Sequence, residues 1–570
     1  MTTQHLSAKA RSPRLRTGVA FIAGIAATGL VLTGCGGGPA AEGEGPDFDF
    51  SGKEVGAMAD FGVGTTFVAT TDEPLEFSML YRDHEGYPLQ ENWPFFTALE
   101  SNQNVTFALE AKPRSDWDQA KATIIAAGDS PEIVTVTYPG QEIPFVASGT
   151  LLPVSDFVQY MPNYLDKADK WDLQPDLDLL RQADGKYYIL PGFAEILRPQ
   201  YTYAVRADVW EELGLSLEPE SWDSFKADLE KVKAAYPALY PISDRWTDGD
   251  PLGATLNFAA SNFGTRAGWG YADGVAWNGS EFEYTGASEE YKELIAYFAD
   301  LVADGLMDPA SIGQSDDQAK AKFANGESLV IATNDQEILA HRQAFEDGGN
   351  TAAEVALLRV PAGPDGDKLE SGGRLGPGIL ISAKAAESEH FKALLQFVDW
   401  LFYSDEGLEF AKWGVEGEQF TVSGGERTFT ADWDRNGINP GAPKALNVDG
   451  GFSNGAFMGN EGSTTDLMLS MARPEVVDFI NTMTTKTQQP QAPAWPLDEI
   501  ENEQATLWKQ ALKDIVWQNT AQFILGQRSL SEWDAYVGQL QDAGMQNYID
   551  LVNEAQQRHA EAIANAGSAE

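Results

Sequence analysis

The sequence predicts an α/β fold, because strand-like and helix-like segments alternate along most of its 570 residues. Residues 75–81 and 105–110 alternate apolar and polar side chains, as half-buried strands do. Residues 132–137 form a β-branched run that is typical of a fully buried strand. Helical periodicity separates these three strands, so we expect a parallel sheet covered by helices.

The helices are predicted from apolar periodicity and from boundary residues. Ser115 has the character of an N-cap for the helix between the second and third strands, and a Gly-Asp-Ser-Pro break at 128–131 ends that helix. The last stretch, 497–566, is almost wholly helical. The other predicted elements are helices near 89–99, 115–127, 222–235, 291–303 and 391–401, and a buried strand at 329–332.

Composition limits what the chain can be. With 43% hydrophobic and 11% aromatic residues, it can build cores for two or three domains. Its one cysteine, Cys35, excludes a disulfide or thiolate metal cluster within the body. The 86 acidic and 39 basic residues give a formal net charge of −47. Such a surface repels phosphate backbones, so we expect no nucleic-acid partner and no direct adhesion to anionic lipid.

The first residues have the pattern of an export signal. Four basic residues precede an apolar run that begins near residue 18 and is too short for a membrane span of about 20 residues. The run closes on Leu32-Thr33-Gly34-Cys35, which resembles a bacterial lipobox. We predict a signal peptide at 1–34, lipidation of Cys35 and a flexible lipid-anchored linker at 35–73 that is rich in Gly and acids. An ordinary secretory leader with an incidental cysteine is the alternative.

Seven short motifs occur in order along about 280 residues: G-D-S-P-E-I-V at 128–134, G-T-L-L-P-V at 149–154, G-K-Y-Y-I-L-P at 185–191, R-A-D-V-W-E-E-L-G-L at 206–215, P-E-S-W-D at 219–223, F-A-N-G-E at 323–327 and S-D-E-G at 404–407. They resemble motifs of the extracellular solute-binding proteins of ABC importers, in the large sugar-binding family that includes the maltose-binding protein. Two further segments, 414–420 and 530–545, resemble the long, oligosaccharide-binding branch of that family.

The resemblance implies a two-lobed periplasmic-binding-protein-like fold with hinge-crossing strands, a ligand cleft between the lobes and a largely helical C-terminal region. One lobe should hold residues 74–190 plus 376–425, and the other 191–375 plus 426–570. It further implies a monomer that captures a carbohydrate and delivers it to ABC transporter permease subunits. Resemblance to the long branch implies that this carbohydrate is an oligosaccharide. With the lipobox, the expected location is the outer face of the cell membrane.

Sugar binding needs flat aromatic platforms and planar hydrogen-bonding groups, and loops that follow strands are where such groups gather. Glu195 falls where maltose-type relatives carry a ligand-binding Glu. Trp246 and Trp269 could equally be core residues, and Arg82 and Glu195 could form a salt bridge at the lobe boundary. The predicted ligand contacts are Tyr81, Arg82, Tyr138, Glu195, Trp246, Asn257, Trp269, Asn334, Asp335, Trp413 and Glu416.

An enzyme is the competing class: a secreted glycoside hydrolase or another cell-surface carbohydrate-active protein. The many carboxylates would suit a hydrolase, but no catalytic motif picks out a pair, and the five His are scattered. We therefore predict a binding protein without a cofactor. Residues 432–437 imitate the first half of an EF-hand loop, but Pro443 stands where a bidentate Glu is required, so no metal is expected.

Overall fold

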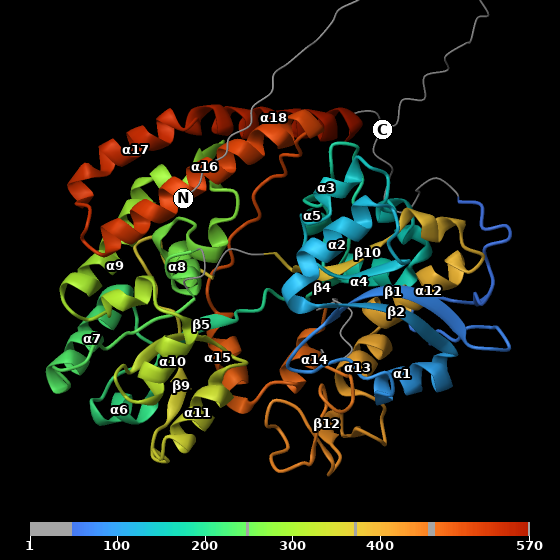
Figure 1. Ribbon diagram of the computed structural model, residues 1–570, viewed down its shortest axis with the longest axis horizontal. Helices are drawn as coiled ribbons and strands as arrows, with labels where there is room; N and C mark the ends of the chain where they lie inside the picture. Colours follow the sequence, from blue (N-terminus) through green and yellow to red (C-terminus); the bar gives the residue numbers. More distant parts are fainter. Residues whose placement is uncertain (1–47, 247–249, 370–372, 454–461, 568–570) are drawn as a thin grey trace, which may run out of the picture.

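The computed structural model describes residues 48–246, 250–369, 373–453 and 462–567, and the chain folds around two large apolar cores (Figure 1). The first core is built from residues between 67 and 193 and between 379 and 467. The second core is built from residues between 203 and 369 and between 476 and 555. The predicted two-lobed α/β architecture is confirmed, and each lobe is assembled from segments distant in the sequence.

The first lobe contains a five-stranded sheet in the order β2-β1-β3-β10-β4. β1 (Leu75–Asp83) pairs in parallel with β2 (Val105–Pro113) and with β3 (Ile133–Thr137), as the sequence predicts. β10 (Leu375–Ile381) joins from the far half of the chain and runs antiparallel to β3 and to β4 (Leu190–Phe193). The sheet is therefore mixed, and β10 and β4 are the strands through which the chain enters and leaves this lobe.

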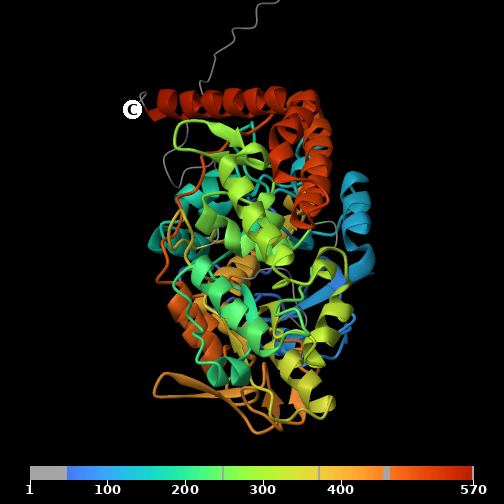
Figure 2. The ribbon, with the colours of Figure 1, turned by 90° about the vertical axis from the view of Figure 1, so that its left-hand side faces the viewer.

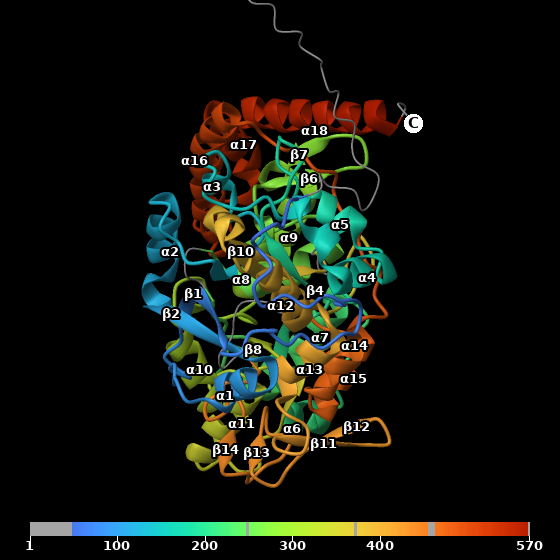
Figure 3. The same ribbon diagram turned by 90° about the vertical axis from the view of Figure 1, so that its right-hand side faces the viewer.

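Helices cover the sheet, and α12 (Phe391–Tyr403) is central because all of its residues except Lys392 are buried (Figure 3). The predicted helix at 89–99 begins only at Pro94, since the residue before a proline avoids helical backbone. The N-cap prediction for Ser115 is wrong: Ser115 lies in a 3-10 turn and α2 starts at Trp117. The remaining helices are α1 (Pro94–Ala98), α2 (Trp117–Ala126), α3 (Ile143–Val146), α4 (Pro162–Lys170), α5 (Gln174–Asp178), α13 (Asp405–Trp413) and α14 (Thr465–Ser470).

The second lobe has a three-stranded antiparallel sheet, β8-β5-β9, formed by β5 (Tyr201–Arg206), β8 (Val330–Asn334) and β9 (Val355–Leu357). α7 occupies its predicted range because Ser221 and Ser224 form a reciprocal capping box. The other elements are α6 (Ala207–Glu212), α7 (Trp222–Ala235), α8 (Gly253–Ala260), β6 (Val275–Trp277), β7 (Phe282–Tyr284), α9 (Glu289–Ala303), α10 (Asp316–Ala324), α11 (Ile338–Asp347) and α15 (Pro474–Met483).

The C-terminal region is helical, as predicted: α16 (Glu499–Ile524), α17 (Trp533–Asp542) and α18 (Met545–Gly567). α18 lies along the top of the molecule in two perpendicular views (Figures 1 and 2). Asn553 attaches it to β7, accepting the N–H of Phe282 at 2.7 Å and donating to its carbonyl at 2.9 Å. No helix among the described residues is both long and apolar enough to cross a membrane.

The boundary predicted at residue 425 is wrong, because it would divide a β-hairpin. β11 (Phe420–Ser423) pairs with β12 (Glu426–Phe429), and this hairpin places Phe429 4.4 Å from the ring centroid of Trp413 in the first core. β13 (Trp433–Asp434) and β14 (Lys444–Ala445) follow on the same lobe. First-core residues continue to Leu467, so the first lobe extends some 40 residues beyond the predicted boundary.

The linker prediction is wrong from residue 48 onward, because that segment packs on the first lobe. Phe67 is fully buried in the first core, and Phe48 and Phe50 contact the ring of Phe391. The N–H of Val55 donates to the carbonyl of Glu389 at 2.9 Å. Aromatic side chains spaced along the segment outweigh its Gly-rich composition. The predicted signal peptide, Cys35 and residues 36–47 lie outside the described residues.

The first prediction tests this attachment. Phe67→Ala should lower the free energy of unfolding by about 3–5 kcal/mol, because it leaves a cavity in the first core. Val63→Ala is the matched control, since Val63 is 57% exposed in the same segment. Denaturant unfolding measures both variants, and equal small losses would contradict the packed arrangement.

Candidate ligand-binding cleft

Three chain segments cross between the lobes and line a hollow of about 480 Å³. The first joins β4 to β5, the second leads into β10, and the third runs from Ser463 through α14 to α15 (Figure 1). Backbone hydrogen bonds hold these segments together. Ala194 N–H donates to the Arg374 carbonyl at 2.9 Å, and Ser463 N–H donates to the Phe193 carbonyl at 2.7 Å. The hollow therefore lies at the junction about which the lobes are connected.

Glu195 lies at this junction and lines the cleft. Its Oε2 accepts the backbone N–H of Thr465 at 2.6 Å, at the start of α14, and its own N–H donates to the carbonyl of Ser463 at 3.2 Å. The side chain is thus positioned by the third crossing segment. Among the described residues it forms no salt bridge with Arg82, which is not a lining residue.

Three aromatic side chains form a cluster on the second lobe. Tyr201 lines the cleft, and its ring centroid lies 5.1 Å from that of Trp269 and 5.7 Å from that of Trp246. The two indoles are 5.3 Å apart. Trp269 is 40% exposed, so this cluster offers aromatic surface beside the cleft, which suits the apolar face of a sugar ring.

Buried charges support the aromatic cluster. The guanidinium of Arg245, which is fully buried, lies 3.7 Å from the ring centroid of Trp246 and donates from Nε to the Ala332 carbonyl at 2.8 Å. Arg245 also pairs with Glu337 at the start of α11. Trp246 has a φ of 61°, a strained backbone for a non-glycine residue, and these contacts hold it there. Trp246 therefore has a supporting part in the cluster, with one face covered by Arg245.

Polar groups of the second lobe reach the cleft at the end of β8. Asn334 Oδ1 accepts the N–H groups of Gln336 and Glu337, each at 3.1 Å, which shapes the turn into α11. Asp335 is 9% exposed and pairs with Arg198 from the first crossing segment. Its Oδ1 has no hydrogen-bond partner among the described residues. The turn therefore presents an amide and a paired carboxylate to the cleft.

Cationic side chains outnumber carboxylates around the hollow. Among the described lining residues the carboxylates are Glu195 and Asp335. The cationic side chains that line it are Arg198, Arg374, Lys412, Arg435 and Arg473.

Some of the predicted ligand contacts lie together at the cleft, and others lie elsewhere in the structure. Tyr138, Glu195, Asn334 and Asp335 line the cleft, whereas Trp246 and Trp269 are not lining residues and pack against Tyr201, which is one. The predictions for Tyr81 and Trp413 are wrong, because both are core residues at 1% and 0% exposure.

The remaining predicted contacts lie away from the lining. The Oδ1 of Asn257 packs against Gly270, where an added Cβ would lie 2.1 Å from it. Glu416 is exposed on the turn before β11, and Arg82 is at the end of β1. None of these three lines the hollow, so their contact with ligand stays a prediction.

Sequence reasoning missed Tyr201, Arg435 and Arg473. Tyr201 opens β5, where a strand pattern gives an aromatic residue no functional meaning. Arg473 precedes Pro474 at the start of α15, and Arg435 follows β13. Only the meeting of distant segments distinguishes these arginines from other surface cations.

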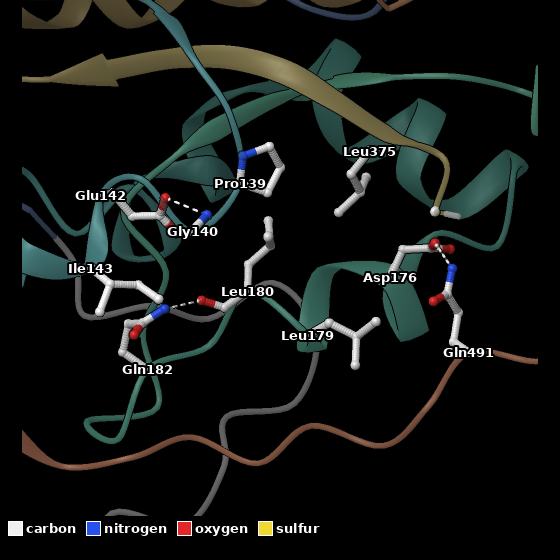
Figure 4. A pocket seen from close by; sticks show the side chains of 11 residues that line it. Pro139, Gly140, Glu142, Ile143, Asp176, Leu179, Leu180, Gln182, Leu375 and Gln491 are labelled. Atoms are coloured by element: carbon white, nitrogen blue, oxygen red, sulfur yellow. Dashed lines mark hydrogen bonds between the residues drawn. The ribbon is translucent and has the colours of Figure 1, made fainter. Parts of the chain in front are cut away.

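A smaller hollow of about 320 Å³ adjoins the cleft, sharing Gly373 with it (Figure 4). Leu179, Leu180 and Leu375 surround it, and Asp176 accepts a hydrogen bond from Gln491 at 3.3 Å on one side. Glu142 lies at the opposite side, as Figure 4 shows. This hollow is mainly apolar and borders the loop that carries Tyr138.

Glu142 is an acid kept from water. It is 1% exposed, and its Oε2 accepts the N–H of Gly140 at 2.8 Å. Burial raises the pKa of Glu142 to about 7, although the hydrogen bonds and nearby Lys121 oppose the shift. Lys121 donates to the Val136 carbonyl at 3.2 Å, at the end of β3. The hydrogen bonds of Glu142 and Lys121 thus hold both ends of the loop that carries Tyr138.

The second prediction concerns this buried acid. An unfolded Glu loses its proton near pH 4.5, whereas folded Glu142 keeps it until about pH 7, so its contribution to stability falls as pH rises between these values. Glu142→Gln cannot ionise at this position. Between pH 5 and pH 7.5 its free energy of unfolding should therefore rise relative to that of the native chain, by roughly 3 kcal/mol at most. Urea unfolding of both proteins at the two pH values measures this, and a difference independent of pH would contradict it.

The EF-hand-like segment has a structural use. The carboxylate of Asp434 accepts the N–H of Gly437 at 3.0 Å and that of Asn439 at 2.7 Å, which closes the turn after β13. The described residues contain no group of three His, Cys, Asp or Glu side chains arranged to hold a metal ion.

Comparison with known proteins gives one family match and several similar folds. The family model described as "Bacterial extracellular solute-binding protein" matches residues 84–408. A binding protein of Brucella abortus (strain 2308) is 24% identical over 327 residues, which cover 56% of this chain and 71% of that protein.

Two solved structures share the fold over most of both chains. One is the alginate-binding protein AlgQ2 without calcium ion, with a TM-score of 0.63 and 16% identity over 85% of this chain and 99% of that chain. The other is an HMO-binding, ABC-transporter-associated solute-binding protein of Bifidobacterium longum infantis, with a TM-score of 0.64 and 19% identity over 85% and 99%.

Proposed function

The chain belongs to the bacterial extracellular solute-binding proteins, and we propose that it captures a carbohydrate between its lobes and delivers it to the permease of an ABC importer. The observation that carries the proposal is the aromatic cluster of Tyr201, Trp246 and Trp269 beside a polar interlobe cleft. Sugars require this combination of a flat aromatic surface and hydrogen-bonding groups. The names of the two similar structures, which refer to alginate and to HMO, support a saccharide as ligand.

Capture by closure follows from the crossing segments. Tyr138 and Arg435 belong to the first lobe, whereas Tyr201, Asn334 and Asp335 belong to the second. A ligand in the cleft would contact both sets only when the lobes approach about the crossing segments. The bound form would then differ from the free form in shape, which is what a transporter needs to distinguish them.

The hydrolase alternative loses support, since the family consists of binding proteins rather than enzymes. In the cleft, the carboxylates have other partners: Glu195 accepts a backbone N–H and Asp335 pairs with Arg198. A glycosidase requires two carboxyl groups placed across the scissile bond, one of them protonated. We propose binding without turnover.

The third prediction compares two tryptophans. Trp269→Ala should weaken saccharide binding by about 1–3 kcal/mol, and should lower stability without ligand less than the loss of a core tryptophan would, because the residue is 40% exposed. Trp413→Ala is the matched control and should lower stability by about 3–5 kcal/mol, because Trp413 is fully buried.

Calorimetry against an oligosaccharide panel and thermal unfolding of each variant measure both effects. Mass spectrometry of the sugar after incubation should recover it intact. Unchanged affinity in Trp269→Ala would contradict the assignment of the aromatic cluster to the binding site. Cleavage of the sugar would overturn the proposed function.

The lipid anchor and the monomeric state are also proposed. The lipobox-like Leu32-Thr33-Gly34-Cys35 supports attachment at the outer face of the cell membrane through acyl chains on Cys35. Such an anchor would hold the folded lobes close to the permease.

The fourth prediction tests the anchor. Cys35→Ser should move the protein from the membrane fraction to the soluble fraction, because the thiol needed for acylation is lost. Fractionation and immunoblotting measure the distribution, and circular dichroism of the released protein checks that it is folded. Membrane retention equal to that of the native chain would contradict the lipoprotein assignment.

A further inference from the structure

The cleft has the opposite electrostatic character to the chain as a whole. The sequence carries a net charge of −47, yet the described lining of the hollow has five cationic side chains and two carboxylates. An acidic exterior repels an anionic ligand, so a basic cleft within it is a local arrangement that binding chemistry must explain.

The partners of these side chains show which charges remain uncompensated. Arg198 pairs with Asp335, and Arg374 pairs with Asp176 at 2.9 Å. The positive charges of these two arginines are therefore each compensated by a carboxylate of the protein. The carboxylate of Glu195 is partly engaged by the N–H of Thr465 at 2.6 Å. The carboxylates of the lining are therefore held at fixed positions, and Asp335 also favours the charged form of Arg473.

Arg473 is buried with donor capacity to spare. Its side chain is 8% exposed, and its Nη1 has no hydrogen-bond partner among the described residues. Its Nε lies 3.3 Å from Glu475, but Glu475 is shared with Arg342, which is 2.7 Å away. The carboxylates of Glu475 and Asp335 are thus shared among the guanidinium groups of Arg342, Arg473 and Arg198, and a positive charge remains at the cleft.

Arg435 faces the cleft from the first lobe. Its Nε donates to Ser453 Oγ at 3.0 Å, and the described part of the chain places no carboxylate within ion-pair distance of it. Neighbouring Asn436 donates to the carbonyl of Met471 at 2.9 Å, which brings this segment against the residues leading to Arg473. Burial lowers the pKa of both arginines, which means that each charged form lacks full solvation.

We propose that the ligand is an acidic saccharide, one bearing carboxylate or sulfate groups, and that Arg435 and Arg473 bind its anionic groups while Tyr201 and Trp269 receive its ring faces. This inference rests on the proposed function and names its substrate class. The fork of donors on a guanidinium matches carboxylate and sulfate oxygens, and a buried guanidinium with a free donor gains most from such a partner. Neutral hydroxyl groups would leave the positive charge of the cleft uncompensated.

The test uses the full chain and sets of oligosaccharides matched in length and linkage, each in a neutral, a uronate and a sulfated form. Isothermal titration should show an acidic form binding at least about tenfold more tightly than its neutral counterpart. Raising the salt concentration should weaken the acidic form more than the neutral one. The uronate and sulfated arms distinguish the two sources of negative charge.

Variants locate the effect. Arg473→Gln and Arg435→Gln should each weaken binding of the acidic form about ten- to a hundredfold, and should weaken binding of any neutral form much less. Arg114→Gln is the control, since it removes the same charge from an exposed site outside the cleft lining. Because the two arginines lie on different lobes, failure of one variant to fold leaves the other as the test, with thermal unfolding as the check.

The outcomes separate this inference from the proposed function. Neutral sugars that bind as tightly as acidic ones, or variants that lower both affinities equally, would overturn the acidic ligand while the proposed function stands. Absence of binding to every neutral and acidic saccharide would overturn both. Preference for an acidic form that persists in both Gln variants would also overturn the assignment to these arginines.

Discussion

The cleft depends on the backbone hydrogen bonds that join the three crossing segments. Phe193 and Ala194 bond to Ser463 and Arg374, so residues from three distant parts of the chain meet at one place. This junction positions Glu195 and the start of α14, and the proposed approach of the two lobes would take place about it. Because backbone groups make these bonds, the bonds themselves do not depend on the side chains of the residues that form them.

The cleft lining differs in charge from the rest of the protein. The chain as a whole carries a strongly negative net charge, which disfavours binding of polyanions to its exterior, while cations gather where the lobes face one another. A guanidinium such as that of Arg473, buried and incompletely bonded, is costly unless a partner arrives. Arg245 shows the alternative use of a buried guanidinium, since its pairing with Glu337 and its stacking on Trp246 serve the aromatic cluster.

Much of the candidate site could be predicted from residues that follow strands. Tyr138 follows β3, Asn334 ends β8, Asp335 follows β8, and Glu195 follows β4; all four line the cleft. β3 and β4 both run antiparallel to β10, so their carboxyl ends lie at the same edge of the first-lobe sheet, which is why this rule works for Tyr138 and Glu195. It fails for Trp413, which ends a helix rather than a strand and is covered by the β11–β12 hairpin. The sequence does not distinguish an aromatic residue that stacks on a ligand from one that packs in a core.

The sequence by itself determined the alternation of strands and helices, the helical C-terminal region and the family, because periodicity and short motifs are local properties. The tertiary structure alone decided that residues 48–73 pack on the first lobe, that the first lobe extends to Leu467, and that Tyr201, Arg435 and Arg473 share a cleft. Those outcomes depend on contacts between residues hundreds of positions apart. Burial and charge compensation at such contacts are properties of the assembled fold, and no window of sequence contains them.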